Sequence, residues 1–145
     1  MYICDDKRRY LFNVILQTII FLIIGCRSSN NSYLYIPANI VEQVIDYKDI
    51  QQFFHPEIKG RIPLLISNNL VDPNISLTKF GEKVKILPES EIKQDAFIKF
   101  DSFEVSGNSA VVKILYGIEG ISAEFKFEKV SKEKWNLKQA KIYER

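Results

Sequence analysis

The sequence predicts an α+β domain in which an N-terminal helical region packs on a curved antiparallel sheet that ends in a four-stranded meander. Two patterns and the composition lead to this prediction. Apolar residues recur at helical spacing between residues 39 and 54, whereas runs rich in β-branched and aromatic residues follow from 97 to 143. The chain has 145 residues, of which 46% are hydrophobic. That is enough for one packed core.

The first 26 residues are typical of a secretory leader. Lys7-Arg8-Arg9 is positively charged, an apolar stretch follows over 10–24, and the leader ends in Leu22-Ile23-Ile24-Gly25-Cys26. This last segment resembles the lipobox of bacterial lipoproteins. An ordinary signal-peptidase site fits less well, because bulky Ile23 lies three residues before the cut. A transmembrane helix is the other alternative, although the apolar stretch spans only roughly 24 Å of a roughly 30 Å hydrocarbon core.

The lipobox resemblance implies that Cys26 is lipidated and that the protein is attached to the membrane through this residue. Acyl chains at about 0.8 kcal/mol per buried methylene would hold the chain there. Arg27 follows the cysteine, where an aspartate would signal retention in the inner membrane. We therefore expect a lipid-anchored protein of the cell envelope, in the outer rather than the inner membrane, on its periplasmic or surface side. The predicted organisation is a signal peptide over 1–25, the lipidated cysteine and a flexible tether over 26–38, and one α+β domain over 39–145.

The charge and cysteine content exclude several classes of function. After removal of the leader, the chain has 17 basic and 16 acidic residues. This balance predicts no nucleic-acid binding and no polybasic patch for anionic lipid. Beyond Cys26 there is no cysteine, and His55 is the only histidine. We therefore expect no histidine- or cysteine-based metal site, no disulfide and no cofactor.

The helical region begins and ends at recognisable signals. Asn39 and Glu42 have the spacing of a capping box, with Asn39 as the N-cap. The region 39–54 is either one helix or two short ones, and the β-branched pair before Asp46 is where a break would occur. The pair His55-Pro56 predicts the end of the region, since the residue before a proline avoids the α conformation.

Strands are predicted by short apolar runs between turn residues. The run 61–66 contains Pro63, which favours an edge strand, and 84–87 is a second short strand. The separators in the C-terminal half are so short that its strands must be antiparallel neighbours. The apolar alternation shifts phase after Phe100 and after Leu137, which predicts a β-bulge in each of these strands. The four meander strands are predicted over 97–105, 109–116, 121–130 and 135–143.

A helical region before a curved sheet whose last strand has the pattern Trp-x-Leu-x-x-Ala-x-Ile, from Trp135 to Ile142, resembles the cystatin-like and NTF2-like architecture. NTF2-like domains usually have more helices, so the cystatin-like arrangement fits equally well. The chain also resembles small uncharacterised lipoproteins of Gram-negative bacteria, a resemblance that implies no activity.

Two residues are candidates for ligand or partner contacts. His55 at a helix end favours an imidazole bonded to the last carbonyls, and the alternative is a pocket acid/base group paired with Asp72 or Asp101. Arg61 could hold a carboxylate ligand, although a salt bridge to Glu57 or another surface carboxylate is the more ordinary interpretation. No catalytic residues are predicted.

The sequence thus leaves two classes of function. The first is a lipoprotein whose small non-catalytic domain is an interaction or accessory module with an envelope protein partner. The alternative is an NTF2-like pocket protein that binds, or transforms, a small apolar ligand. The two classes differ in whether side chains fill the helix-facing side of the sheet.

Overall fold

The computed structural model describes residues 34–144, so the predicted leader, Cys26 and most of the tether lie outside the described residues. The described residues belong to one compact unit. Ile36 belongs to its core, because its side chain is buried and its N–H donates to the Leu70 carbonyl at 2.8 Å. The packed chain therefore includes residues within the stretch predicted as tether.

The unit is α+β, with a six-stranded mixed sheet in the order β4-β1-β5-β6-β7-β8 and a separate two-stranded hairpin. β5 to β8 form the predicted antiparallel meander, and its strand limits agree with the prediction to within one residue at nearly every end. Their bounds are Phe97–Ser106, Ser109–Tyr116, Ile121–Ser131 and Lys134–Glu144. The other elements are α2 (Ala38–Ile45), α3 (Lys48–Gln51), β1 (Leu65–Ser67), β2 (Thr78–Lys79), β3 (Glu82–Lys83), β4 (Lys85–Leu87), and the 3₁₀ helices η1 (Glu89–Glu91) and η2 (Gly117–Glu119).

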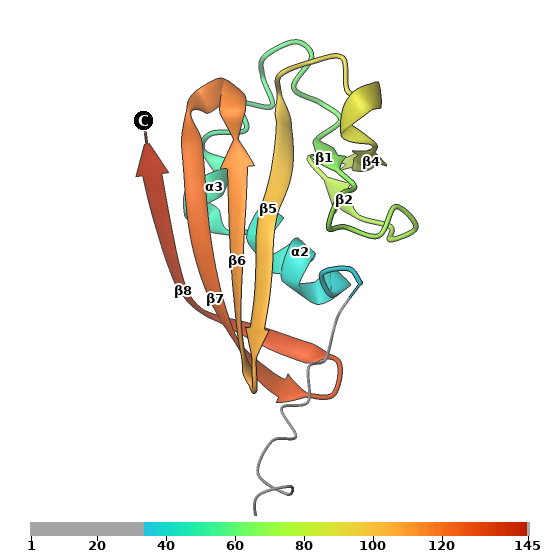
Figure 1. Cartoon of the computed structure of the whole chain (residues 1–145). Helices are drawn as coiled ribbons and strands as arrows, with labels where there is room; N and C mark the ends of the chain where they lie inside the picture. The colour runs from blue at the N-terminus through green and yellow to red at the C-terminus, as the bar shows by residue number, and fades with distance from the viewer. Residues whose placement is uncertain (1–33, 145) are drawn as a thin grey trace, which may run out of the picture. The chain divides into compact units, whose positions relative to one another are not determined.

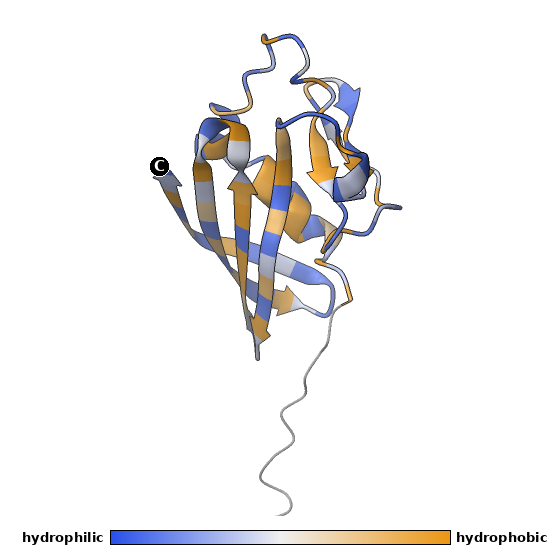
Figure 2. Ribbon diagram, turned by 45° about the horizontal axis from the view of Figure 1, so that its top comes forward, coloured by the Kyte–Doolittle hydropathy of each residue, from blue (hydrophilic) through white to orange (hydrophobic). Residues whose placement is uncertain are grey.

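Both α-helices lie on one face of the meander, and no element of residues 34–144 covers its other face (Figure 1). Hydrophobic and hydrophilic residues alternate along the strands (Figure 2), which separates a buried face from a wet one. α2 contributes an apolar stripe to the buried face through Ile40, Val41, Val44 and Ile45. The largest fully buried side chains of the core are Trp135, Tyr116, Phe54, Phe100 and Phe125.

The predicted capping box at the start of the first helix is wrong. Pro37 is the N-cap, and its carbonyl accepts the first helical hydrogen bond from Ile40 at 2.9 Å. Asn39 lies inside the first turn, where its amide donates to the carbonyl of Trp135 on β8 at 2.9 Å instead of to its own helix. A distant backbone acceptor therefore determines the role of Asn39. The predicted break near Asp46 is confirmed, since α2 ends there.

Both predicted β-bulges are present. The β5–β6 register shifts between Phe100 and Ser102, which returns Phe103 to the side of the sheet that Phe100 occupies. On β8, Leu137 and Gln139 pair with consecutive residues of β7, so Lys138 is the additional residue. Each bulge keeps the apolar residues on the helix side after the phase of the sequence changes.

The region between the helices and the meander differs from the prediction. β1 begins only at Leu65 and lies between β4 and β5, parallel to both, not at an edge of the sheet. Pro63 precedes the strand, so its missing N–H interrupts no strand pairing. The β2–β3 hairpin was not predicted. It is held to the helical region by Lys79, whose ammonium group lies 2.6 Å from the Asp46 carboxylate.

Candidate functional site

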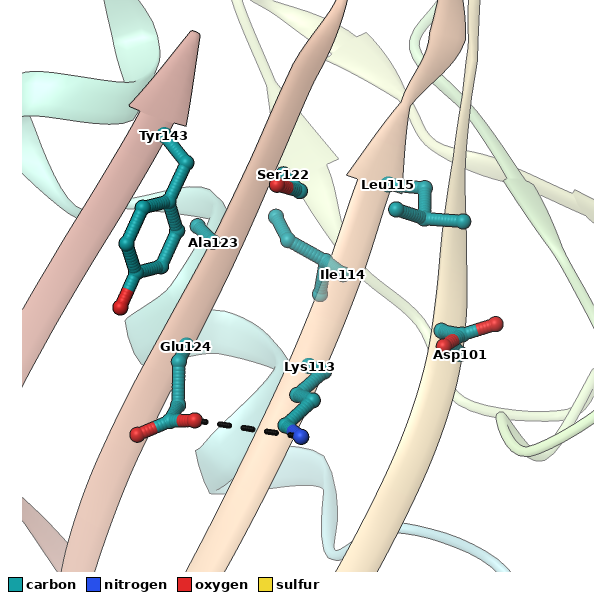
Figure 3. Close-up of a pocket in the computed structure, with 8 residues that line it drawn as sticks. All are labelled: Asp101, Lys113, Ile114, Leu115, Ser122, Ala123, Glu124 and Tyr143. Carbon is teal, nitrogen blue, oxygen red and sulfur yellow. Dashed lines mark ion pairs between the residues drawn. The ribbon is translucent and has the colours of Figure 1, made fainter. Parts of the chain in front are cut away.

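The uncovered face of the meander, which we call the outer face, carries an open depression of about 360 Å³. Its polar side chains come from all four meander strands and face the same side (Figure 3). Asp101 lies on β5, Lys113 on β6, Glu124 on β7 and Tyr143 on β8. The residues that line the depression are Asp101, Lys113, Ile114, Leu115, Ser122, Ala123, Glu124 and Tyr143.

Glu124 is at the centre of the charges on the outer face. Its carboxylate lies 4.0 Å from the Lys113 ammonium on the neighbouring strand and 3.8 Å from that of Lys126. These distances are long for hydrogen-bonded ion pairs, and the lysine side chains are about half exposed. The three groups are therefore free to form closer pairs with a partner, because exposed pairs contribute only about 0–1 kcal/mol. Tyr143, which is 51% exposed, adds an aromatic ring to this polar surface.

His55 does not have either of the predicted roles. Its Nδ1 lies 3.0 Å from the carboxylate of Glu57, two residues along the chain, and not against a helix carbonyl. Neither Asp72 nor Asp101 contacts it among the described contacts. The pKa of Glu57 is lowered from its ordinary value by its own backbone amide first and by the His55 ring second. Because the Glu57 side chain is 67% exposed and that of His55 38% exposed, this pair is a local surface contact.

Arg61 forms an internal ion pair, although with a different carboxylate from the one that sequence proximity suggests. One guanidinium nitrogen lies 2.5 Å from Glu119 in η2, and another donates to the Tyr116 hydroxyl at 2.9 Å. Burial alone would lower the pKa of Arg61, but these two partners outweigh it and leave the pKa raised. Burial raises the pKa of Tyr116 despite the opposing effect of Arg61. The cluster fastens the α3–β1 loop to the β6–β7 turn and offers no free guanidinium for a ligand.

The helix-facing side of the sheet is filled by interlocked aromatic rings. Tyr47 meets Phe125 edge-on at 5.5 Å between ring centroids, and Phe54 meets Tyr116 at 5.6 Å in the same geometry. Phe80 from the β2–β3 turn packs against Phe54 from another side, at 6.1 Å. These contacts hold the rings of Phe54, Tyr116 and Phe125 in the buried core.

Among residues 34–144, no group of three or more His, Cys, Asp or Glu side chains is placed to hold a metal ion. No helix among the same residues is long and apolar enough to cross a membrane.

Sequence reasoning missed the outer face as a site. The alternation in 121–128 correctly placed Ser122, Glu124 and Lys126 on a wet face. The neighbours of Glu124 depend on the register between strands, in which Lys113 lies opposite Glu124 on one side and Lys141 on the other. The signal that could have found them is the same alternation in the second run, Ser109–Tyr116, once the tight turns fix the register.

Comparison with family models, with curated proteins and with solved structures finds no match for this chain.

Proposed function

We propose that this protein is a lipoprotein of the cell envelope, anchored through Cys26, whose folded domain binds a protein partner without catalysing a reaction. The outer face of β5–β8 is the proposed binding surface. The observation that carries the proposal is the contrast between the two faces of the sheet. The helix side is filled by buried aromatic residues, whereas the outer face presents loosely paired charges and an exposed tyrosine around an open depression.

We also propose that the domain has the cystatin-like or NTF2-like architecture. Support comes from the curved antiparallel meander with helices on one face and from the two bulges that redirect β5 and β8. Within this architecture, the rings of Phe54, Tyr116 and Phe125 between helix and sheet favour an interaction domain over a pocket protein.

The anchor is tested with the Cys26→Ala variant in cells grown with a labelled fatty acid. We expect the wild-type protein to carry the label and to partition into detergent, and the variant to lose the label and to remain unprocessed or soluble. Unchanged detergent partitioning and unchanged apparent mass of the variant would contradict the proposal and identify the apolar leader as the anchor.

The binding surface is tested by photocrosslinking in cells from residue 122, which lies in the depression on the outer face. A specific crosslinked species should appear in the wild-type background and disappear in the charge-reversal variant Lys113→Glu/Glu124→Lys. The matched control is Lys59→Glu/Glu57→Lys, which exchanges two exposed charges of the α3–β1 loop. A crosslink that survives the outer-face exchange, or that the control removes equally, would contradict the proposed surface.

A further inference from the structure

One end of the domain combines basic and apolar exposed residues. The β5–β6 and β7–β8 turns meet there, as the hydrogen bond of 2.8 Å from the Lys129 N–H to the Asn108 carbonyl shows. The β7–β8 turn is the more charged of the two, and it exposes Lys132 and Lys134 on either side of Glu133. With Lys129, three lysines accompany one glutamate over residues 129–134, while the turn 106–109 carries no charge. We call this the basic end.

The opposite end of the same strands has the opposite charge. Asp95 lies beside Gly117 at the start of β5, and Glu144 pairs with Ile121 at the end of β8. Glu119 in the β6–β7 turn is the third acidic residue, and its charge is paired with Arg61. The near-neutral total predicted no polybasic patch, but the fold places Lys129, Lys132 and Lys134 at one end of the strands and Asp95 and Glu144 at the other. An anionic surface would therefore attract one end and repel the other.

The chain enters the domain at the basic end. The first turn of α2 touches the start of β8 through the hydrogen bond from Asn39 to Trp135, and Figure 1 shows the start of α2 near the turns at this end of the sheet. Leu34, just before α2, is 79% exposed, and Val130 beside the β7–β8 turn is 58% exposed. Only seven residues lie between Cys26 and Leu34. Fully extended, the eight chain steps from Cys26 to Leu34 reach at most about 28 Å.

We propose that the basic end docks on an anionic lipid surface, with Lys132 and Lys134 at the headgroups and Leu34 and Val130 at the boundary with the acyl chains. This inference rests on the proposed lipid anchor at Cys26. Each lysine near an anionic surface contributes about a fivefold increase in affinity. Such attraction is weak for a free domain, but a short tether holds the basic end close to the bilayer and so raises its effective concentration. In this orientation the strands point away from the bilayer, and the outer face stays accessible to a protein partner.

The test supplies the anchor chemically and uses the single tryptophan as the probe. Residues 26–145 contain one cysteine, Cys26, which is coupled to a thiol-reactive lipid in vesicles. Trp135 lies at the start of β8, next to the β7–β8 turn, so energy transfer from it to a dansyl-labelled headgroup reports the approach of the basic end. The variant Lys132→Glu/Lys134→Glu is compared with Lys59→Glu/Lys93→Glu, two exposed lysines outside the basic end. Circular dichroism checks that every protein is folded.

We expect strong transfer on vesicles containing phosphatidylglycerol and weak transfer on phosphatidylcholine alone. On the anionic vesicles, the Lys132/Lys134 variant should lose at least about twenty-five-fold in the ratio of docked to undocked protein, from two lysines at about fivefold each. The control variant should keep the wild-type transfer. Equal transfer on both vesicles, or an equal loss in both variants, would overturn the docking. Neither result depends on acylation in cells, so a failure of the anchor at Cys26 is recognised separately by the fatty-acid label.

Discussion

Replacing Gln43 tests how the first helix is fixed to the last strand. Its amide forms two contacts with the backbone of β8: it donates to the Trp135 carbonyl at 2.7 Å and accepts from the Leu137 N–H at 3.0 Å. The side chain thus bonds to the edge of β8 in the way that a neighbouring strand would. Gln43→Met preserves length and helix propensity but removes both contacts.

The expected loss in the free energy of unfolding depends on which hydrogen bonds the Trp135 carbonyl and the Leu137 N–H keep in the variant. The Trp135 carbonyl still accepts the hydrogen bond from the Asn39 amide, at 2.9 Å, so it keeps one donor. The Leu137 N–H loses the partner that Gln43 provides. Two half-buried hydrogen bonds at about 1 kcal/mol each predict a loss of about 1–2 kcal/mol in the free energy of unfolding. Adding Asn39→Ala removes the remaining side-chain donor to Trp135, and we expect the double variant to lose more than the sum of the single losses.

Urea denaturation gives the free energies, and amide hydrogen exchange at Leu137 locates the change. Gln52→Met is the matched control, because Gln52 is exposed and donates only to the Asp49 carbonyl of its own helix region, at 2.9 Å. It should change the free energy of unfolding by less than about 0.5 kcal/mol. The reasoning is refuted if Gln43→Met unfolds at the wild-type urea concentration with the Leu137 amide equally protected.

Two further predictions concern the core. Phe125→Ala removes a fully buried ring and should cost about 3–5 kcal/mol in urea denaturation, whereas Lys126→Ala, one residue further on the outer face, should cost less than about 0.5 kcal/mol; equal costs would contradict the assignment of faces. Because burial raises the pKa of Tyr116 in the folded state, the neutral phenol stabilises the fold fully below the unfolded value of about 10. This contribution is lost as the pH rises through the folded pKa. The free energy of unfolding of Tyr116→Phe should therefore fall less steeply with rising alkaline pH than that of the wild type. Tyr143→Phe is the exposed control. Identical pH profiles for Tyr116→Phe and wild type would exclude this role of the phenol.

The meander was predictable because each of its signals is local. Residues 121–128 alternate strictly between apolar and polar, and short turns leave no choice of neighbour. Even the bulges were visible, since the phase changes after Phe100 and Leu137 only make sense if the chain keeps its apolar residues on one side.

The middle of the chain was harder to predict because its pairings are distant or lack a turn signal. β1 pairs in parallel with β4 and β5, and nothing near Leu65 indicates those partners. The β2–β3 hairpin turns at Phe80-Gly81, both at positive φ, where Asn-Gly would be the usual signal. Phe80 adopts this conformation while its ring packs on Phe54, a tertiary contact that local propensity does not include.

The candidate sites likewise combine local features that the sequence reveals with distant contacts that it does not. Arg61 was a candidate for holding a carboxylate, and sequence proximity suggested Glu57, yet the fold brings Glu119 to it from 58 residues away. Asn39 had the spacing of an N-cap, but Pro37 already begins the helix and leaves the amide free to reach Trp135. In both cases a distant segment determines the partner. Arg61 pairs with a carboxylate as predicted, whereas Asn39 donates a hydrogen bond where an N-cap would accept one.

These partners also determine how a protein could bind to the sheet. α2 occupies the start of the β8 edge through Gln43, and no described strand pairs with the remainder of that edge. The remainder carries the Lys138 bulge and the exposed Lys141, two features that oppose the addition of a further strand. Strand addition is thus disfavoured along β8. A partner would instead contact the outer face through side chains, where the loosely paired Lys113 and Glu124 and the exposed Tyr143 line the same depression.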